Sequence, residues 1–374
     1  MTPVRTGVTA GVLGAGVIGA AIARALAGRG ALVTLIDAQD RSREASWAAG
    51  GMLAPHSEFD APSPLFDLGR ASLALYPALR DELLDATGQD IDLRLSGTLL
   101  PALTAADERE IEAKRAFLAS QGIAHQLLSP AQLAREEPAL TTAARGALET
   151  PDHAVDNRRL WSALFEDCAR RGVVMAMGER IERVETHAGR VTGLHTAARM
   201  IAADEFVLAA GAWSGGLASL FGFDLPAEPI KGQLLKLDVP PDLVRRVIRH
   251  GHTYLVPRTG TELVVGATSE EAGFEKAVTE EAMCHLHRSA AALVPALAKR
   301  PVMERWAGLR PRLADGLPAL GRVPGLANLT LATGHYRNGI LLTPITGEIV
   351  ARLIHGEDPG ADLAPFDPAR FPAA

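Results

Sequence analysis

Three glycines near the N-terminus have the spacing of a turn that binds the phosphates of a dinucleotide. Gly14, Gly16 and Gly19 follow the apolar run 8–13, and Asp37 lies eighteen residues after the last glycine. A backbone without side chains lets a pyrophosphate approach closely, while the start of a helix supplies free N–H groups and partial positive charge. Asp37 is placed to accept hydrogen bonds from both hydroxyls of the adenosine ribose. The motif favours a dinucleotide site over a packing turn, but it does not distinguish FAD from a nicotinamide cofactor.

The elements that must position this motif are a strand, a turn, a helix and a second strand. The helix that starts at the glycines carries Ile18, Ile22 and Leu26 on one face, and 32–36 is a second apolar strand. Strands that are apolar throughout are typical of a parallel sheet covered on both faces. This order predicts an α/β fold with a Rossmann-like dinucleotide-binding domain.

Farther along the chain, polar and apolar residues alternate. The alternation appears at 235–238 and in two segments, 252–257 and 262–267, that are expected to form the arms of a hairpin. Such alternation is typical of an antiparallel sheet with one exposed face. We therefore predict a second, mainly antiparallel α+β domain that binds the substrate. The predicted dinucleotide-binding domain comprises 1–80, 146–220 and 306–374, and the substrate domain comprises 81–145 and 221–305.

Composition argues against several classes of protein. The chain has 374 residues, of which 47% are apolar, enough for two domains with buried cores. Its 38 basic and 44 acidic residues give a net charge of -6, which leaves no excess of positive charge for nucleic acid. Two cysteines cannot form a disulfide framework. Cys284, His285 and His287 are too few ligands for a zinc site, so we expect no metal.

The uncharged run 7–23 follows Arg5 and has some features of a signal peptide. It contains five glycines, lacks a clear cleavage site and is, at 17 residues, short for a bilayer span. We therefore expect a cytoplasmic protein without a membrane segment.

Five further segments extend the pattern that begins with the glycine motif. They are 48–53, 207–214, 254–258, 306–311 and 334–344. In this order they resemble the glycine oxidase (ThiO-type) branch of the D-amino-acid oxidase family of flavoenzymes, over nearly the whole chain. The resemblance implies FAD as the cofactor. Because neither Cys168 nor Cys284 lies in a matching segment, we expect FAD to be bound noncovalently.

The resemblance also implies which residues contact FAD. The N-terminal group is Gly14, Gly16, Val17, Ile18, Gly19, Asp37, Ala38, Ala45, Ser46, Gly50, Gly51 and Met52. Ile181 is expected to meet the adenine through its backbone, and Gly211 is expected at the cofactor as well. The group that lines the isoalloxazine is His335, Tyr336, Arg337, Asn338, Gly339, Ile340 and Leu341.

The residues after this segment predict a helix. It begins at Thr343 and Pro344 and has Ile345, Ile349 and Leu353 as its expected buried face. If its N-terminus faces the flavin, it stabilises the negative charge of the reduced form.

Substrate binding is expected to depend on Arg310, Tyr254 and Arg337. A free carboxylate is best held by a planar, bidentate donor, which arginine supplies and lysine does not. The resemblance implies that Arg310 holds the carboxylate, that Tyr254 adds its hydroxyl and that Arg337 lies nearby. From the residue type alone, a surface ion pair is the alternative for Arg310. Trp47 and Arg312 depart from the family pattern and are expected to affect the pocket entrance.

The implied reaction needs no nucleophile, metal or acid–base pair from the protein. A hydride passes from the substrate's α-carbon to flavin N5, and the imine hydrolyses to a 2-oxo acid and ammonia. Oxygen then reoxidises the flavin and forms hydrogen peroxide. The resemblance implies an oxidase of glycine, small amines and D-amino acids that serves thiamine thiazole synthesis, with a small amino acid and oxygen as its partners and a homo-oligomer left open.

Three alternatives remain at the level of sequence. The first is a flavin D-amino-acid dehydrogenase that passes electrons to a carrier instead of oxygen. The second is a nicotinamide dehydrogenase, which shares the glycine motif. The third is a flavin-binding protein without catalytic activity, because a fold does not guarantee an activity.

Overall fold

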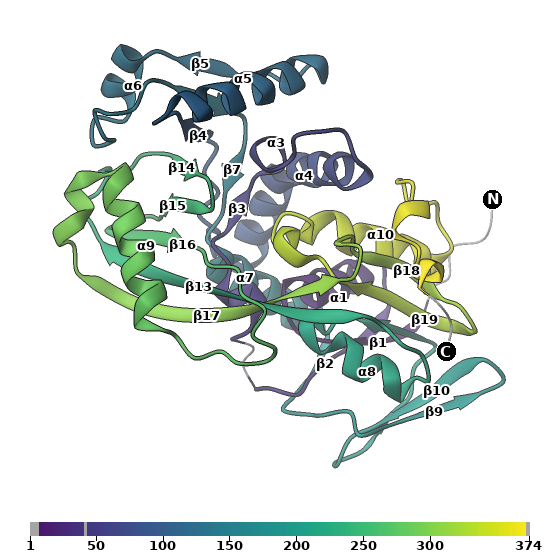
Figure 1. Cartoon of the computed structure of the whole chain (residues 1–374). Helices are drawn as coiled ribbons and strands as arrows, with labels where there is room; N and C mark the ends of the chain where they lie inside the picture. The colour runs from purple at the N-terminus through teal and green to yellow at the C-terminus, as the bar shows by residue number, and fades with distance from the viewer. Residues whose placement is uncertain (1–6, 41–42, 372–374) are drawn as a thin grey trace.

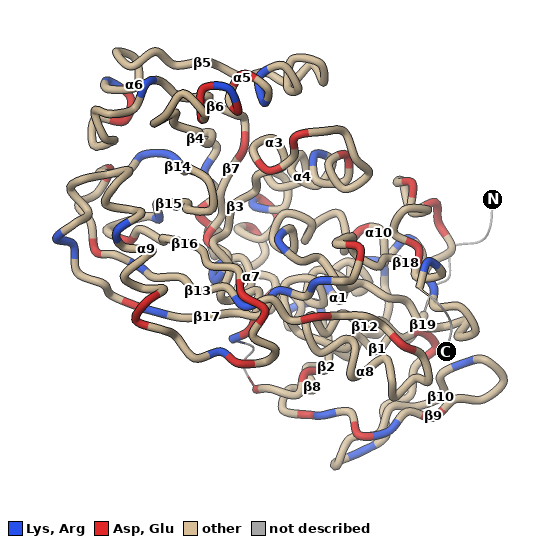
Figure 2. The backbone as a smooth tube through the Cα atoms, in the orientation of Figure 1, with Lys and Arg blue, Asp and Glu red and all other residues tan. Residues whose placement is uncertain are grey.

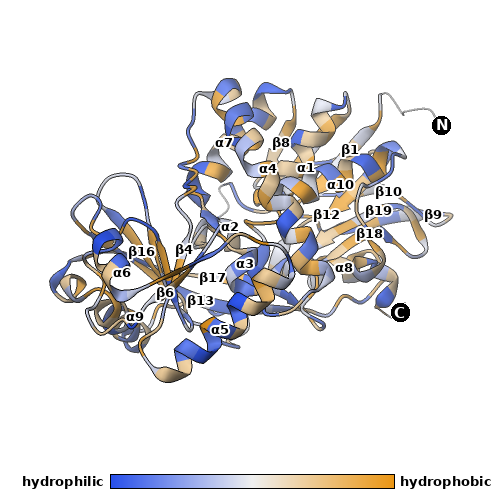
Figure 3. Cartoon of the chain, turned by 90° about the horizontal axis from the view of Figure 1, so that it is seen from above, coloured by the Kyte–Doolittle hydropathy of each residue, from blue (hydrophilic) through white to orange (hydrophobic). Residues whose placement is uncertain are grey.

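The computed structural model of the chain describes residues 7–40 and 43–371 and contains two large sheets (Figure 1). A six-stranded sheet contains the strands on either side of the glycine motif, and an eight-stranded sheet lies beside it. Seen from above, the strands of both sheets are largely apolar, and the helices around them carry the more polar surfaces (Figure 3). The predicted α/β fold with a second, mainly antiparallel sheet is confirmed.

The six-stranded sheet has the order β18-β19-β12-β1-β2-β8 and is parallel except at its β18 edge. Val12 and Leu35 pack among the helices on one face, whereas Leu13 and Ile36 pack against a small sheet and α8 on the other. Both faces are covered, which explains why these strands are apolar throughout. The strands are β1 (Thr9–Leu13), β2 (Leu32–Asp37), β8 (Val174–Met177), β12 (Glu205–Leu208), β18 (Ala319–Val323) and β19 (Leu326–Thr333).

Four helices cover the first face and a three-stranded sheet with one helix covers the second. The helices of the first face are α1 (Val17–Gly28), α4 (Pro64–Thr87), α7 (Asn157–Arg170) and α10 (Thr343–His355). The second face carries β9 (Arg183–His187), β10 (Arg190–His195), β11 (Met200–Ile201) and α8 (Ser214–Leu220).

The eight-stranded sheet has the order β17-β13-β16-β15-β14-β4-β6-β5, and its neighbours are antiparallel except β4 and β14. Helix α9 (Glu280–Leu293) packs on a face that includes Leu235, Leu255 and Leu263. The long β13–β17 pair extends from this sheet toward the six-stranded sheet (Figure 1). The strands are β4 (Thr98–Pro101), β5 (Gln126–Leu128), β6 (Ala147–Thr150), β13 (Ala227–Asp238), β14 (Val247–His250), β15 (Thr253–Pro257), β16 (Glu262–Gly266) and β17 (Val302–Leu313).

Shorter elements connect the two sheets and complete the chain. They are α2 (Ala45–Ala48), β3 (Met52–Leu53), α3 (Pro55–Glu58), α5 (Ala105–Ser120), α6 (Pro130–Glu136), β7 (His153–Ala154), η1 (Gly211–Trp213), η2 (Pro295–Lys299), η3 (Tyr336–Asn338), η4 (Ala364–Phe366) and η5 (Pro368–Arg370).

The division into domains at the sequence-derived limits stays a prediction. Strands β6 and β17 pair within the eight-stranded sheet, although the predicted limits assign all of β6 and most of β17 to the dinucleotide-binding domain. Pairing of strands therefore places these two segments with the sheet that was expected to bind the substrate.

Helix α10 begins at Thr343 as expected, but its buried face differs from the predicted one. Ile349 is fully buried, whereas Ile345 and Leu353 are only partly buried. The physical reason is close packing against α1, because a Cβ atom on Gly347 would lie 2.9 Å from the carbonyl oxygen of Ala21. The helix turns its glycine toward α1, and the neighbouring isoleucine moves to the edge of the contact.

Basic and acidic residues are interspersed along the chain, and neither sign covers one side (Figure 2). Among the residues that the structure describes, no helix has both the length and the apolar composition needed to cross a bilayer.

One buried carboxyl group makes the stability of the fold depend on pH. Glu137, at the end of α6, is 1% exposed, and burial raises the pKa of its carboxyl to about 7. Its Oε2 accepts a hydrogen bond from the N–H of Arg245 at 3.1 Å, while Oε1 has no partner among the described residues. The folded state therefore favours the protonated carboxyl, so stability falls as the pH rises from the unfolded value of about 4.5 through about 7.

We expect Glu137→Gln to remove this loss of stability at high pH. The amide keeps an oxygen for Arg245, so the variant should gain about 2–4 kcal/mol relative to the natural chain above pH ~7 and little below pH ~4.5. Urea unfolding across this range measures the difference. The control is Glu136→Gln, which removes a neighbouring, partly exposed carboxylate that pairs with Arg246. An equal pH dependence in the Glu137 variant and the natural chain would contradict the assignment.

Candidate active site

A cavity of about 790 Å³ lies where the two sheets meet. Its wall contains Gly14, Asp37 and Ala209, which follow or end strands of the six-stranded sheet. Tyr254 and Arg310 contribute to the wall from β15 and β17 of the other sheet. The carboxyl ends of parallel strands are where α/β folds bind ligands.

The glycine turn closes tightly because it lacks side chains. A Cβ atom on Gly19 would lie 1.7 Å from the carbonyl oxygen of Gly14, and Gly14 itself has a φ of +105°. Gly16 is the N-cap of α1 and has no side chain to cap the helix, whose first turn carries no acidic residue. The N–H of Val17 donates to Ser46 Oγ at 3.0 Å. The positive end of the α1 dipole therefore meets the cavity without an acidic side chain in the helix's own first turn.

Asp37 ends β2 and forms the next part of this wall. Its Oδ2 accepts a hydrogen bond from the N–H of Ala15 at 2.8 Å, and its Oδ1 accepts one from the N–H of Gln39 at 2.9 Å. Both carboxylate oxygens are thus oriented by backbone N–H groups, one in the glycine turn and one just after β2. A carboxylate held in this way can accept further hydrogen bonds from ligand hydroxyls.

A buried arginine braces the opposite wall at the junction of the sheets. Arg258 donates from Nη2 to the carbonyl oxygen of Gly50 at 2.8 Å and from Nη1 to that of Val155 at 2.9 Å. It also donates to Asn157 Oδ1 at 3.0 Å. Burial lowers the pKa of Arg258, and these three acceptors compensate part of its desolvation. The Gly50 loop is thereby fixed against the eight-stranded sheet.

The segment around η3 is anchored to the helices behind it. The Tyr76 hydroxyl, buried in α4, donates to the carbonyl oxygen of Ile340, and Ser72 Oγ donates to that of Leu341 at 2.5 Å. His335 is buried and lies 3.1 Å, Nε2 to Oγ1, from Thr346. Burial lowers the pKa of His335 to about 3, so its ring is neutral at physiological pH. This wall is rigid and uncharged at His335.

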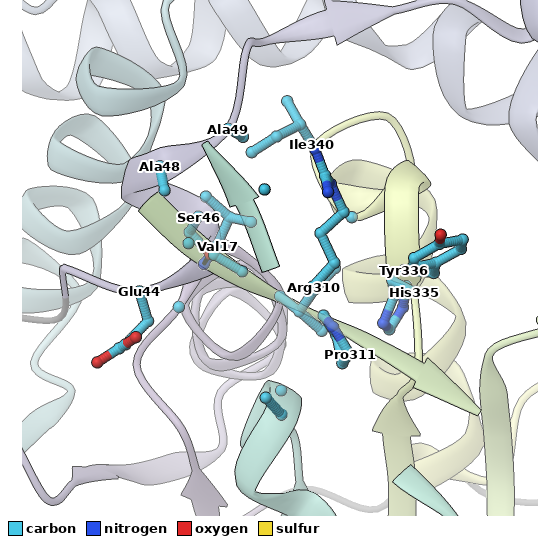
Figure 4. A pocket seen from close by; sticks show the side chains of 18 of the residues that line it. Val17, Glu44, Ser46, Ala48, Ala49, Arg310, Pro311, His335, Tyr336 and Ile340 are labelled. Carbon is cyan, nitrogen blue, oxygen red and sulfur yellow. Dashed lines mark hydrogen bonds between the residues drawn. The ribbon is translucent and has the colours of Figure 1, made fainter. Parts of the chain in front are cut away.

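Arg310 projects from β17 into the cavity, between Val17 and Ser46 on one side and His335 and Tyr336 on the other (Figure 4). Its Nη1 donates to the carbonyl oxygen of Thr268 at 3.1 Å. None of the residues in the described ranges places a carboxylate within ion-pair distance of Arg310, so it forms no surface ion pair.

Glycines allow Arg310 and Tyr254 to lie flat on the strands around them. A Cβ atom on Gly232 would lie 2.4 Å from the Arg310 guanidinium, and one on Gly50 or Gly266 would lie 2.7 or 2.5 Å from the Tyr254 ring. Burial raises the pKa of Tyr254, so its hydroxyl stays protonated and can donate a hydrogen bond. The cavity thus presents a cationic fork and a neutral hydroxyl donor, which suits a carboxylate.

Two charged residues at the Tyr254 and Arg310 end of the cavity were not identified from the sequence. Arg249 lies opposite Tyr254 in the β14–β15 ladder, so the register of the hairpin contains a signal for it. Glu58 ends α3 and faces the same end of the cavity, where burial raises the pKa of its carboxyl against the opposing effects of Arg249, Arg337 and Arg310. No local pattern marks Glu58, because its place depends on contacts with distant strands.

Most of the predicted ligand-contacting residues line this cavity, whereas two do not. Gly19 packs on Gly14, and Leu341 is buried beneath the wall. The residues that do line it are Gly14, Gly16, Val17, Ile18, Asp37, Ala38, Ala45, Ser46, Gly50, Gly51, Met52, Ile181, Gly211, Tyr254, Arg310, His335, Tyr336, Arg337, Asn338, Gly339 and Ile340.

The two residues that depart from the family pattern lie outside the cavity wall. Trp47 packs edge to face on Trp306 and under the guanidinium of Arg158, 3.7 Å from its ring centroid. Arg312 pairs with two exposed glutamates at 2.7 Å each. The expectation that they affect the entrance receives no support from their positions.

The described cysteines and histidines form no candidate metal centre. Cys168 is buried in the core, and Cys284 is exposed on α9. Within residues 7–40 and 43–371, no group of three or more His, Cys, Asp or Glu residues is arranged to hold a metal ion.

Comparisons with known proteins agree with this geometry. Residues 10–353 match the family of FAD dependent oxidoreductases. Glycine oxidase from Geobacillus kaustophilus is 36% identical over 96% of both chains, and glycine oxidase from Pseudomonas aeruginosa is 34% identical over 96% of this chain and 98% of the relative. The bifunctional protein ThiO/ThiG from Trichormus variabilis is 35% identical over 96% of this chain, which spans 54% of that relative.

A solved structure is similar over almost the entire fold. The crystal structure of glycine oxidase from Geobacillus kaustophilus superposes with a TM-score of 0.93 and 35% identity, covering 98% of this chain and 100% of the other. The chain therefore belongs to the FAD-dependent oxidoreductase family of D-amino-acid oxidase type, and FAD is its cofactor.

Proposed function

We propose that this protein oxidises glycine and other small amino acids or amines with oxygen, giving a 2-oxo acid, ammonia and hydrogen peroxide. The observation that carries the proposal is the Arg310 guanidinium, which has no carboxylate partner among the described residues and projects into the cavity that also contains the glycine turn. A cation of this kind is matched by the carboxylate of an amino acid. The similarity to glycine oxidases supports glycine as a substrate.

The residues of the cavity fit FAD. The glycine turn and the α1 N-terminus suit a pyrophosphate, and Asp37 suits the adenosine ribose. The anchored segment 335–340, which presents the neutral ring of His335 to the cavity, suits the flavin ring system. When bound, FAD supplies the acceptor for the hydride from the substrate's α-carbon.

The protein's own residues orient the substrate for this transfer. In the proposal, Arg310 binds the carboxylate and the protonated Tyr254 donates a further hydrogen bond to it. The braced Gly50 loop and the anchored 335–340 segment keep the cavity walls in place during the reaction. Because these groups are rigid, alignment rather than acid–base chemistry is their contribution.

We also propose that the product serves thiamine thiazole formation, which the match to ThiO/ThiG supports. A cytoplasmic location is proposed from the low cysteine content.

A dehydrogenase that passes its electrons to an acceptor other than oxygen differs from an oxidase in one measurable respect. Stoichiometric hydrogen peroxide from glycine in air supports the oxidase, whereas reduced flavin that persists in air supports the dehydrogenase.

Arg310→Ala should weaken substrate binding by about 2–5 kcal/mol, because it removes one member of a desolvated charge pair. FAD should remain bound, which the visible flavin spectrum checks. Anaerobic flavin reduction at increasing glycine concentration measures the apparent affinity. The matched control is Arg312→Ala, which removes the same charge two residues along β17 and outside the cavity. Unchanged glycine affinity in the Arg310 variant would refute the carboxylate assignment.

Asp37→Ala should weaken FAD binding by about 10- to 100-fold, the range for hydrogen bonds to a charged group. Titration of the apoprotein with FAD, followed by flavin fluorescence, gives the affinity. Asp40→Ala is the control, since Asp40 is an exposed carboxylate three residues farther along the chain. If both variants bind FAD as the natural chain does, Asp37 does not contact the ribose.

A further inference from the structure

The substrate end of the cavity carries one acidic side chain among several basic ones. Glu58 lines it together with Arg249, Arg310 and Arg337. The other acidic residues of the cavity wall, Asp37, Glu44 and Glu179, adjoin or contact the end of β2, at the nucleotide end of the cavity. The Glu58 carboxylate accepts no hydrogen bond from any side chain or N–H of the described residues.

An amino acid in water carries an ammonium group beside its carboxylate. If Arg310 holds the carboxylate, the ammonium group needs an acceptor of opposite charge nearby. It must also lose a proton before a hydride leaves the α-carbon, because the nitrogen lone pair stabilises the developing double bond. Glu58 is the acidic side chain that faces this part of the cavity.

We propose that Glu58 binds the substrate's amino group and accepts its proton. This inference rests on the proposed function. In the step, an N–H bond of the ammonium group breaks, the proton moves to a carboxylate oxygen of Glu58, and the bonding electron pair stays on nitrogen as its lone pair. The neutral amine then lies ready for oxidation, and Glu58 returns the proton to water when the product leaves.

The structure holds Glu58 in place through the backbone before it. Asp152 accepts hydrogen bonds from the N–H groups of His56 at 2.9 Å and Ser57 at 2.8 Å, and it also contacts the His56 ring at 2.8 Å. Lys114 Nζ donates to the carbonyl oxygen of Ser57 at 3.2 Å, and a guanidinium N–H of Arg249 donates to the same oxygen. Asp152 is fully buried, so this network of hydrogen bonds fixes the position of α3.

The charges around Glu58 come from several elements. Arg249 on β14, Arg310 on β17 and Arg337 on η3 favour its ionised form, and Asp152 opposes it. Tyr254 on β15 also interacts with it. Burial outweighs the arginines and raises the pKa of Glu58, which makes its carboxylate a stronger base than an exposed one. The alternative role, neutralising the surplus of arginine charge, involves no proton transfer.

Binding of two unreactive ligands to the FAD-loaded enzyme separates these roles. 2-Aminoisobutyrate has a carboxylate and an amino group but no α-hydrogen, and isobutyrate lacks the amino group. We expect Glu58→Gln to weaken 2-aminoisobutyrate binding by about 10- to 100-fold, as for one hydrogen bond to a charged group, and to change isobutyrate binding by less than about twofold. The control, Glu281→Gln, removes an exposed carboxylate of α9 and should change neither. Equal effects of Glu58→Gln on both ligands, or no effect on either, would overturn the proposal.

Proton transfer to Glu58 can also be detected in the natural chain by infrared spectroscopy. This test does not require a variant to fold. In mildly alkaline buffer, 2-aminoisobutyrate should add the infrared C=O band of a protonated carboxyl group, and isobutyrate should not. If no such band appears with 2-aminoisobutyrate, Glu58 does not take the proton. Neither measurement requires turnover, so a failure of the peroxide assay with glycine would overturn the proposed function without deciding the role of Glu58.

Discussion

The charge of Arg310, kept inside the molecule without a carboxylate partner among the described residues, is the constraint on which the site depends. Removing a guanidinium from water is costly unless other groups compensate it. The Thr268 carbonyl supplies one hydrogen bond, and Gly232 lets the guanidinium lie directly on β13. Arg310 also interacts with the Tyr254 hydroxyl, and both side chains line the cavity, where a bound carboxylate would add the missing opposite charge. Ligand binding and stability of the wall are therefore coupled in this part of the molecule.

A second constraint is that residues from both sheets must contact one ligand in a single cavity. Arg258 connects the eight-stranded sheet to the Gly50 loop and to Asn157 at the start of α7. On the far side, Tyr76 and Ser72 hold the backbone that leads into α10. These buried polar contacts are directional, unlike apolar packing, so they set positions and not only proximity. These contacts thereby fix the position of the nucleotide end of the cavity relative to the end that binds the carboxylate.

Much of the first sheet could be predicted from local patterns. Apolar strands beside a helix with Ile22 and Leu26 on one face indicate a parallel sheet, and the glycine spacing indicates the turn between them. The buried face of α10 could not be predicted in the same way. Gly347 has no apolar side chain to contribute to a periodicity, yet it determines the contact with α1 because only a glycine permits the close approach.

The sequence by itself determined the glycine turn with Asp37 at the end of its second strand, the antiparallel hairpin that carries Tyr254, and the class of cofactor, because each depends on neighbouring residues or on a motif. Only the tertiary structure decided that Glu58 and Arg249 share a cavity with Arg310, and that Trp47 and Arg312 lie outside it. Glu58 belongs to a short helix whose position is set by Asp152, almost a hundred residues away. Contacts between such distant segments leave no periodicity in the chain, so their outcome is visible only once the two sheets are packed together.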